Sequence, residues 1–324
     1  MLETERMILR PWSESDAEKL YEYAKDPRVG PIAGWPPHKS VDESLNVIKN
    51  VFSGSECYAI CLKTDNVAVG CIELKLNGHT DMTDRDDECE LGYWLSALFW
   101  GKGYMTEAVR EILRHGFEDL GMTTIWCGYY DGNEKSKRVQ EKCGFIYHHT
   151  CNDVPVPLMG ETRIGHANVL TKEQWQSGLI IRSLSEQEKP SACDLAWKVF
   201  LKYEAPEYSD EGIDEFRSAL DNSEFIGRMR FYGAYHQEKL IGVLAMRQPQ
   251  HISLFFVDEE YHRKGIGRKL FERMRQDYEK QEFTVNSSPY AVLIYKSLGF
   301  VPTDAEQTVN GIRFTPMKYG SEKL

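Results

Sequence analysis

The sequence predicts an α+β protein with two tandem domains, each a mixed, mostly antiparallel central sheet flanked by helices. The main observation is an internal repeat. Residues 90–105 and 252–267 share a strand-like run, a short loop and a glycine-bearing segment that leads into a helical pattern, at a constant offset of 162 residues. A later Gly-Phe pair, 144–145, recurs as 299–300. Because solenoid repeats are only about 20–50 residues long, a repeat of this length indicates two copies of one domain.

Length and composition support this organisation and exclude several classes of protein. The chain has 324 residues, 41% of them apolar and 27% charged, which suits about two packed domains. Residues 1–12 contain no apolar signal-peptide core. The longest uncharged apolar runs, such as 240–246, are far shorter than the roughly 20 residues of a membrane-spanning helix. We therefore expect a cytoplasmic protein with no membrane partner.

The net charge and the cysteine spacing limit the kinds of partner and cofactor that we expect. The net charge is −11, and residues 1–177 hold 28 acidic against 19 basic side chains. An acidic surface repels phosphate backbones, so we expect no nucleic-acid partner and favour a neutral or cationic one. The eight cysteines form no C-x-x-C pair and no cluster with zinc spacing. We expect reduced thiols and no metal.

The predicted elements follow the order β-α-α-β-β-β-α-β-α-β in both halves. In the first half, Ser13 caps one helix, and a Ser40/Glu43 capping box opens a second helix whose buried face includes Val41. Helices also follow the glycine segment and Asn133. Apolar runs predict the strands: Met7–Pro11, Cys57–Leu62, Val67–Leu76, Glu88–Leu95 and Thr123–Tyr129.

The second half repeats this pattern. A Ser185/Glu188 capping box opens its first helix, and a second glycine-led helix follows the third strand of its meander. Its predicted strands include Leu179–Leu184, Arg230–His236, Lys239–Met246 and Ile252–Val257. The Ser-Gly pair at 177–178 marks a break between the halves. We place the domains at residues 1–176 and 177–324.

Each glycine-bearing loop presents the start of a helix to solvent. Unpaired N–H groups at the positive end of a helix dipole can bind an anion, although such turns are often purely structural. The nucleotide-binding pattern G-x-G-x-x-G fails, because residue 106 is Thr and residue 270 is Leu, and no G-x-x-x-x-G-K-[ST] occurs. A dinucleotide-binding fold and a nucleoside triphosphatase are therefore excluded. Basic side chains accompany the loops: Lys102, Arg263, Lys264 and Arg268.

Longer motifs surround the second loop: YHRKGIGRKL at Tyr261–Leu270 and AVLIYKSLGF at Ala291–Phe300. They resemble the pyrophosphate loop, [R/Q]-x-x-G-x-[G/A], and the later tyrosine-bearing helix of the GNAT superfamily of acyl-CoA-dependent N-acyltransferases. In the first half, Leu2–Pro11, Trp100–Ala108 and Asn133–Phe145 resemble the branch that includes ribosomal-protein-alanine N-acetyltransferases. The resemblance covers nearly the whole chain. It implies two tandem GNAT-like domains, acetyl-CoA as cosubstrate and no metal.

The resemblance also implies which residues bind acetyl-CoA. Strand N–H groups at Leu95, and at Phe256 and Val257 in the second copy, would face the pantetheine arm. Asn133 would lie near the cofactor, and Asn286 would orient the cofactor arm or Tyr295, unless it is a simple cap or turn residue. The loops would hold the pyrophosphate through Gly101, Lys102, Gly103, Tyr104, Met105 and Thr106 in the first copy. In the second they would do so through His262, Arg263, Lys264, Gly265, Ile266, Gly267 and Arg268.

This sequence departs from the family pattern at three kinds of position. Trp100 and His262 stand first in the loops, where the family prefers Arg or Gln. Met105 stands where Gly or Ala is usual, and its side chain would crowd the pyrophosphate. Gln140 occupies the place that Tyr295 holds in the second copy.

Candidate catalytic groups differ between the copies. In the second, Tyr295 is the expected general acid, because a phenol with a pKa near 10 stays protonated at neutral pH. In the first, Ser136 matches the position of the branch's hydroxyl near the cofactor sulfur. Glu90 shares one face of its strand with Gly92 and is a candidate base, although it ends an acidic run that is also typical of a solvated loop. The second copy has Ile252 there, so a base would come from Glu204 or water.

The expected reaction is acetyl transfer from acetyl-CoA to a primary amine by direct attack in a ternary complex. The acceptor is a small molecule or a peptide N-terminus, and the protein is a monomer or homodimer. Segments 34–38 and 203–208 contain aromatic and acidic residues that suit a cationic amine, or are simple proline-rich turns. Two alternatives remain: a non-catalytic acyl-CoA sensor, or a partner-binding module with one degenerate domain.

Overall fold

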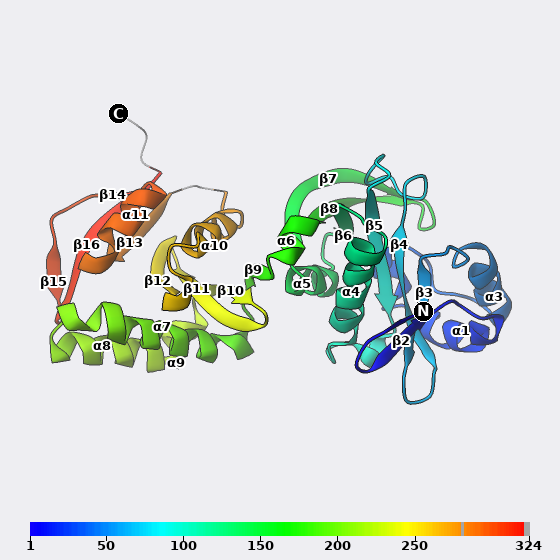
Figure 1. Cartoon of the computed structure of the whole chain (residues 1–324), viewed down its shortest axis with the longest axis horizontal. Helices are drawn as coiled ribbons and strands as arrows, with labels where there is room; N and C mark the ends of the chain where they lie inside the picture. Colours follow the sequence, from blue (N-terminus) through cyan, green and yellow to red (C-terminus); the bar gives the residue numbers. More distant parts are fainter. Residues whose placement is uncertain (280–281, 321–324) are drawn as a thin grey trace. The chain divides into compact units, whose positions relative to one another are not determined.

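The computed structural model describes residues 1–279 and 282–320. It divides into two compact units, Met1–Ser177 and Gly178–Leu324 (Figure 1). Within the described residues, each unit has one main sheet in which one parallel pair of strands interrupts antiparallel pairing. Helices pack on both sheets. The predicted α+β class, with two mixed and mostly antiparallel sheets, is therefore confirmed.

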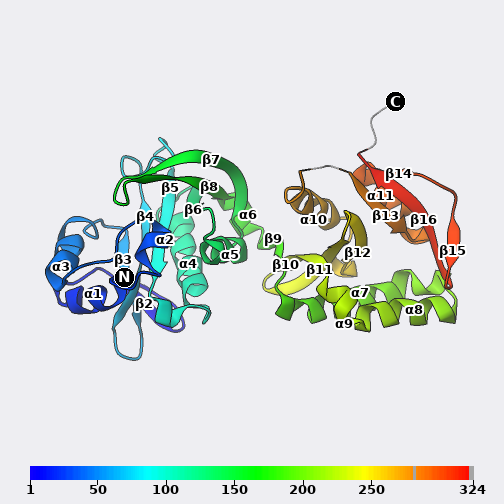
Figure 2. The ribbon, with the colours of Figure 1, turned by 180° about the vertical axis from the view of Figure 1, so that it is seen from behind.

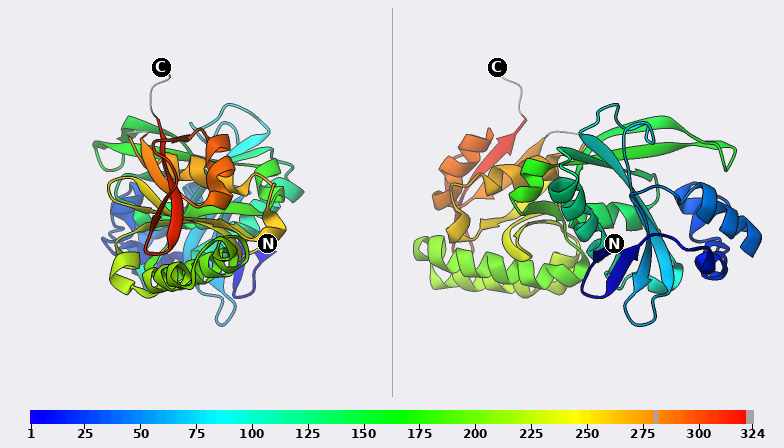
Figure 3. Two further views of the ribbon diagram at one scale, coloured as in Figure 1. Left: turned by 90° about the vertical axis from the view of Figure 1, so that its left-hand side faces the viewer. Right: turned by 45° about the vertical axis from the view of Figure 1, so that its right-hand side comes forward.

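The first unit is built on an eight-stranded sheet of order β1-β2-β3-β4-β5-β6-β8-β7. The strands are β1 (Leu2–Glu3), β2 (Met7–Arg10), β3 (Cys57–Leu62), β4 (Ala68–Lys75), β5 (Glu88–Leu95), β6 (Thr124–Tyr130), β7 (Ile146–Val156) and β8 (Glu161–Thr171). The helices are α1 (Ala17–Ala24), α2 (Gly30–Ala33), α3 (Val41–Asn50), α4 (Tyr104–Arg114), α5 (Glu134–Lys142) and α6 (Lys172–Gln176). Strands β7 and β8 form a long hairpin at one edge of the sheet (Figure 3).

Helices cover both faces of this first sheet (Figure 1). The apolar stripe of α4 recurs every three or four residues, as the sequence predicts, and its buried side chains join the main core of the unit. Along β3, Ile60 packs in that core, whereas its neighbours Ala59 and Cys61 lie with Trp12 on the other face. Trp12 also packs against the cluster formed by α1 and α3. The alternation along the strand therefore separates two apolar layers.

The second unit contains a sheet of order β14-β16-β13-β12-β11-β10-β9, with β15 paired to β16. The strands are β9 (Leu179–Ser183), β10 (Arg230–His236), β11 (Lys239–Arg247), β12 (His251–Val257), β13 (Phe283–Ser287), β14 (Val301–Pro302), β15 (Gln307–Val309) and β16 (Ile312–Tyr319). The helices are α7 (Lys189–Tyr203), α8 (Asp210–Asp221), α9 (Ser223–Gly227), α10 (Ile266–Arg275) and α11 (Val292–Leu298). Seen from behind, α7 and α8 lie along one side of the sheet and α10 along the other (Figure 2).

Adjacent residues of the central strands again point into different layers. On β10, Phe231 packs with the α7 cluster and Tyr232 with the α10 cluster. On β11, Val243 and Leu244 divide in the same way. Both faces of the sheet are therefore buried, which explains the nearly continuous apolar runs in the sequence.

Several local predictions are wrong. Ser40 Oγ accepts a bond from the Glu43 N–H at 3.1 Å, but the Glu43 carboxylate accepts from the Lys39 N–H instead of closing the predicted capping box. Val41, predicted to be buried, is 37% exposed because it lies in the first turn of α3. The short helices α2 and α9 were not predicted, since four or five residues are too few to show a helical period.

Candidate functional site

In each unit the strand before the glycine loop separates from its parallel neighbour. In the described chain, β5 pairs with β6 only over Glu88–Glu90, although β5 continues to Leu95. Likewise β12 pairs with β13 only at His251 and Ile252 and continues to Val257. The edge of each strand beyond the split faces an opening in the sheet. Backbone N–H groups on that edge are available to an extended ligand.

The loop that follows has the same backbone in both units. Its second and fourth residues adopt the left-handed conformation: φ is 74° at Gly101 and 81° at Gly103, and 60° at Arg263 and 77° at Gly265. This conformation directs the chain into α4 or α10, and no side chain caps the first N–H groups of either helix. Three of these four positions are glycine, the residue that adopts a positive φ at little cost.

The loop side chains divide between core and solvent. Lys102, Arg263 and Lys264 are exposed, as an anion-binding loop requires. The Met105 side chain is instead buried in the main core of the first unit, so its backbone alone faces the loop. Tyr104 lies beneath the Arg6 guanidinium, whose carbon is 4.4 Å from the ring centre.

Arginine side chains connect each loop, or the helix that follows it, to neighbouring segments. In the first unit, Arg6 donates to the Lys102 carbonyl at 3.0 Å and forms an ion pair of 2.6 Å with Glu107. In the second, Arg268 donates to the Ser297 carbonyl at 2.9 Å, which ties α10 to the end of α11. The remaining predicted loop residues (Thr106, Ile266 and Gly267) lie in the first turns of the two helices.

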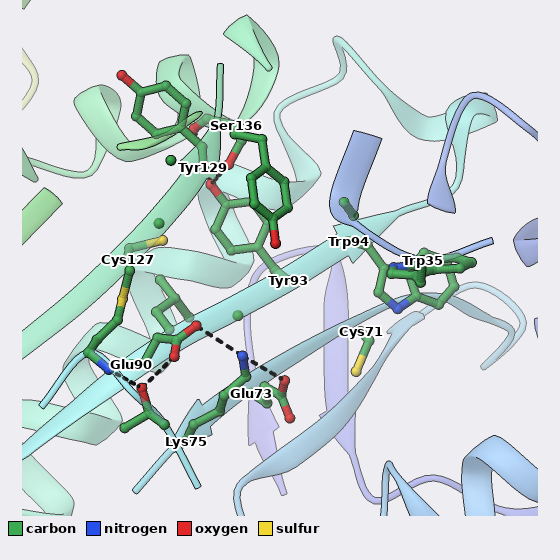
Figure 4. Close-up of a pocket in the computed structure, with 18 of the residues that line it drawn as sticks. Trp35, Cys71, Glu73, Lys75, Glu90, Tyr93, Trp94, Cys127, Tyr129 and Ser136 are labelled. Atoms are coloured by element: carbon green, nitrogen blue, oxygen red, sulfur yellow. Dashed lines mark hydrogen bonds and ion pairs between the residues drawn. The ribbon is translucent and has the colours of Figure 1, made fainter. Parts of the chain in front are cut away.

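A cavity of about 1100 Å³ lies beside the split in the first sheet (Figure 4). It is lined by parts of β4, β5, β6 and β8 and by the segment after α2, including Trp35, Pro36 and His38. Trp35 and Trp94 meet edge to face, with ring centres 5.8 Å apart. The tertiary structure thus brings the predicted segment 34–38 to the same cavity as Glu90 and Ser136.

Glu90 is bound on both carboxylate oxygens. Oε1 accepts from Lys75 at 2.9 Å and Oε2 from Thr80 at 2.5 Å. Lys75 also lies 3.9 Å from Glu73 (Figure 4). Burial by itself would lower the pKa of Lys75, but the two carboxylates raise it overall, whereas burial raises the pKa of Glu73. Glu90 therefore stands in an ion-paired group rather than in the solvated loop that the acidic run also suggested.

Ser136 belongs to a chain of hydrogen bonds behind the cavity. Asn168 Nδ2 donates to Gln140 Oε1 at 2.8 Å, and Gln140 Nε2 donates to Ser136 Oγ and to the Gly128 carbonyl, both at 3.1 Å. Because the Gly128 carbonyl can only accept, the orientation of the Gln140 amide is defined. Ser136 Oγ lies 2.9 Å from the Tyr93 hydroxyl (Figure 4).

Tyr93 and Gln140 are site residues that sequence reasoning missed as participants. Burial raises the pKa of Tyr93 well above its usual value, so its hydroxyl is protonated. Asn133, predicted to lie near the cofactor, is the N-cap of α5 and accepts from the Ser136 N–H at 3.2 Å. Tyr93 lies on β5, 43 residues from Ser136, so no local pattern links them.

In the second unit Tyr295 is buried in α11, between the rings of Phe255 and Phe300, at centre distances of 5.9 and 5.2 Å. Burial and the nearby Glu204 carboxyl raise its pKa, so the phenol is protonated at neutral pH. Burial also raises the pKa of Glu204 to about 7, with Ser288 a smaller, opposing influence. Tyr295 lies in α11, Glu204 follows α7 and Ser288 follows β13, so the fold brings these groups together from three separate segments.

Two polar residues of the second unit, Ser288 and Asn286, differ in exposure: the first is buried and the second is exposed. Ser288 Oγ is buried and makes no hydrogen bond of normal geometry to the described residues. Asn286 is exposed within β13, opposite Pro316, so the alternative that it is a simple cap or turn residue is wrong. Strand β13 is the neighbour of β12 in the sheet. A role of Asn286 toward the cofactor stays a prediction.

The described residues contain neither a membrane-spanning helix nor a cluster of metal ligands. No helix in this part of the chain is long and apolar enough to cross a membrane. No group of three or more His, Cys, Asp or Glu side chains among residues 1–279 and 282–320 is arranged to hold a metal ion.

Comparison with known proteins identifies both halves. Residues 6–146 and 204–320 each match a family model described as "Acetyltransferase (GNAT) domain". The uncharacterized N-acetyltransferase p20 from Bacillus licheniformis is 30% identical over 130 residues, which are 38% of this chain and 70% of p20.

Solved structures of acetyltransferases are similar to about half of this chain. A GNAT-family acetyltransferase from Bacillus anthracis aligns with 22% identity and a TM-score of 0.47 over 53% of this chain and 98% of its own. A ribosomal-protein-S5-alanine acetyltransferase from Vibrio fischeri aligns with 19% identity and a TM-score of 0.41 over 53% and 97%. The family expected from the sequence motifs is confirmed by the two family models: the chain belongs to the GNAT acetyltransferases, with one domain of the family in each half.

Proposed function

We propose that this protein transfers the acetyl group of acetyl-CoA directly to a primary amine, and that both domains bind the cofactor. The observation that carries the proposal is the duplicated arrangement of a split strand, a loop with two left-handed residues and a helix start without a side-chain cap. Two binding sites are therefore expected in one chain.

The residues present fit acetyl-CoA. The split edges of β5 and β12 offer a row of backbone N–H groups to an extended arm that itself contains amides. The helix starts and the exposed Lys102, Arg263 and Lys264 suit a pyrophosphate. When bound, acetyl-CoA supplies a thioester carbonyl, the electrophile of the reaction.

Proton transfers are assigned to different groups in the two domains. In the second, Glu204, with a pKa of about 7, accepts the proton of the attacking amine, and Tyr295 donates one to the departing thiolate. In the first, the Ser136–Tyr93 pair donates a proton to the departing thiolate, and Glu90 accepts the proton of the attacking amine directly or through water.

Direct attack fits the state of two buried thiols in the first domain. Cys71 and Cys127 both line the cavity, and burial raises the pKa of each thiol well above its usual value. Such thiols contain little thiolate and are poor nucleophiles. The third cysteine of the cavity lining, Cys151, is exposed, so this argument applies to Cys71 and Cys127 alone. The proposed mechanism is a ternary complex in which no cysteine is acylated. A primary amine on a small molecule or a peptide N-terminus is the proposed acceptor.

Calorimetric titration of the whole chain with acetyl-CoA tests the proposal. We expect two equivalents to bind. Gly103→Val and Gly265→Val should each reduce this number to one, because a β-branched residue strongly disfavours the positive φ at these positions. No binding at millimolar acetyl-CoA would overturn the acetyltransferase proposal, and one equivalent in the parent chain would overturn the claim of two sites.

A further inference from the structure

The two loops share a contact between their first side chain and the strand before them. The ring N–H of Trp100 donates to the Leu95 carbonyl, with 2.8 Å between nitrogen and oxygen. His262 Nε2 lies 2.8 Å from the Val257 carbonyl. Both bonds join the same two positions of the 162-residue repeat. Because a carbonyl oxygen can only accept, His262 bears a proton on Nε2.

Each ring is also covered by a side chain from a helical segment. Lys135, on α5, places its ammonium 3.9 Å from the centre of the Trp100 ring. Tyr203, at the end of α7, lies beside His262, with ring centres 5.1 Å apart. The covering residue differs in chemistry and origin between the domains, whereas the ring N–H bond is the same. The bond is therefore the common feature of the two loops.

Indole and imidazole are different in size, and they share a planar ring that carries an N–H group. The family pattern has Arg or Gln at this position, and those side chains also carry N–H donors. The bond closes a five-residue connection from the strand end to the loop, directly before the first left-handed residue. At Arg263 that conformation is unfavourable for a residue with a side chain, so the loop needs contacts that hold it.

We propose that Trp100 and His262 are positioning residues that lock each loop onto the end of its split strand. The lock fixes the spacing between the N–H groups proposed to bind pyrophosphate and those proposed to face the pantetheine arm. This inference rests on the proposed function. A ligand that reaches both sets of N–H groups benefits from a fixed spacing, whereas a ligand that reaches the loop alone does not.

The test compares two ligands at one site at a time. Trp100→Phe is made in the Gly265→Val background and His262→Phe in the Gly103→Val background, which leaves one cofactor site in each protein. Phenylalanine keeps a ring and removes its N–H donor. Calorimetry measures the Kd of acetyl-CoA and of adenosine 3′-phosphate 5′-diphosphate, the fragment of CoA that ends at the pyrophosphate.

We expect each phenylalanine variant to weaken acetyl-CoA binding roughly five- to tenfold, the effect of one net hydrogen bond. Binding of the fragment should weaken less than twofold. The repeat itself supplies the conservative variants: Trp100→His and His262→Trp should restore binding to within about twofold of the parent. Thermal unfolding of each variant reports any general loss of structure.

Three results would overturn the inference: unchanged acetyl-CoA binding in the phenylalanine variants, equal weakening of both ligands, or failure of the exchanged rings to restore binding. Each of these leaves the proposed function in place, because the single-site parents still bind acetyl-CoA. Absence of binding in both single-site parents would instead overturn the proposed function together with this inference.

Discussion

The two domains have nearly the same backbone at the cofactor loop and different side chains behind it. The repeat aligns Gln140 of the first domain with Tyr295 of the second. Gln140 belongs to a polar chain from Asn168 to Ser136. Tyr295 instead lies between two phenylalanine rings, with the Glu204 carboxyl nearby.

This difference shows that cofactor binding and proton transfer place different requirements on the same fold. Binding an extended cofactor depends on backbone N–H groups and turn conformation, which many sequences can supply and which both copies retain. Proton transfer depends on the pKa of particular side chains, which packing sets differently in each domain. In the proposed mechanism, the duplicated chain therefore pairs two similar binding frameworks with two different sets of proton-transfer groups.

The largest difference between the domains is expected for Tyr295→Phe, made in the Gly103→Val background. We expect kcat of the second domain to fall about 10²- to 10³-fold, because the proposed general acid is lost. The Kd of acetyl-CoA, measured by calorimetry, should change little, since the ring and its packing remain. An unchanged kcat would remove Tyr295 from the mechanism.

Glu204→Gln tests the base by pH dependence in the same background. With the pKa of Glu204 raised to about 7, kcat/KM of the parent should rise as pH increases through 7, when the carboxyl becomes ionised. The variant should be about 10- to 100-fold slower at pH 8 and lack this rise. A retained rise would assign the base to another group.

The same substitution has a stability signature. The folded-state pKa of Glu204 lies above its ordinary value of 4.5, so the folded protein holds this proton more tightly than the unfolded chain does. The stabilisation is complete below pH 4.5 and is lost as pH rises through about 7. The stability of the parent relative to Glu204→Gln, measured by urea unfolding, should therefore fall between pH 5 and pH 8.

The smallest effect is expected for Ser136→Ala in the Gly265→Val background. Turnover by the first domain should fall about tenfold, because Tyr93 keeps a hydrogen bond to the Ser136 carbonyl, at 3.1 Å, and a protonated hydroxyl at the site. Tyr93→Phe should cost at least as much. A fall in turnover as large as that expected for Tyr295→Phe would show that each domain depends on a single proton donor.

Much of the fold could be predicted from the sequence because its signals are local. The stripe of α4, the strand β5 and the left-handed turn before each helix arise from residues a few positions apart. The internal repeat then extended each local prediction to a second copy. Local prediction was wrong where one residue decides the outcome, as with the exposed Val41 in the first turn of α3.

The candidate site was predicted less completely. The motifs located Glu90, Ser136 and Tyr295. Their partners Lys75, on β4, and Tyr93, on β5, were not predicted, whereas Glu204, at the end of α7, was expected as one of two possible bases. Such pairs are separated by between 15 and about 90 residues. No periodic pattern reports contacts across those distances.

The duplicated family fold and the position of each glycine loop could be inferred from the amino-acid sequence, because backbone conformation and apolar periodicity are encoded by neighbouring residues. The surroundings of the candidate groups became visible in the folded structure. In the folded chain, Glu90 forms an ion pair with Lys75, and Tyr295 is buried close to Glu204. The ring N–H groups of Trp100 and His262 donate to carbonyls at the ends of the preceding strands. Hydrogen-bond partners and pKa shifts depend on burial and on distances between remote segments, which exist once the chain has folded.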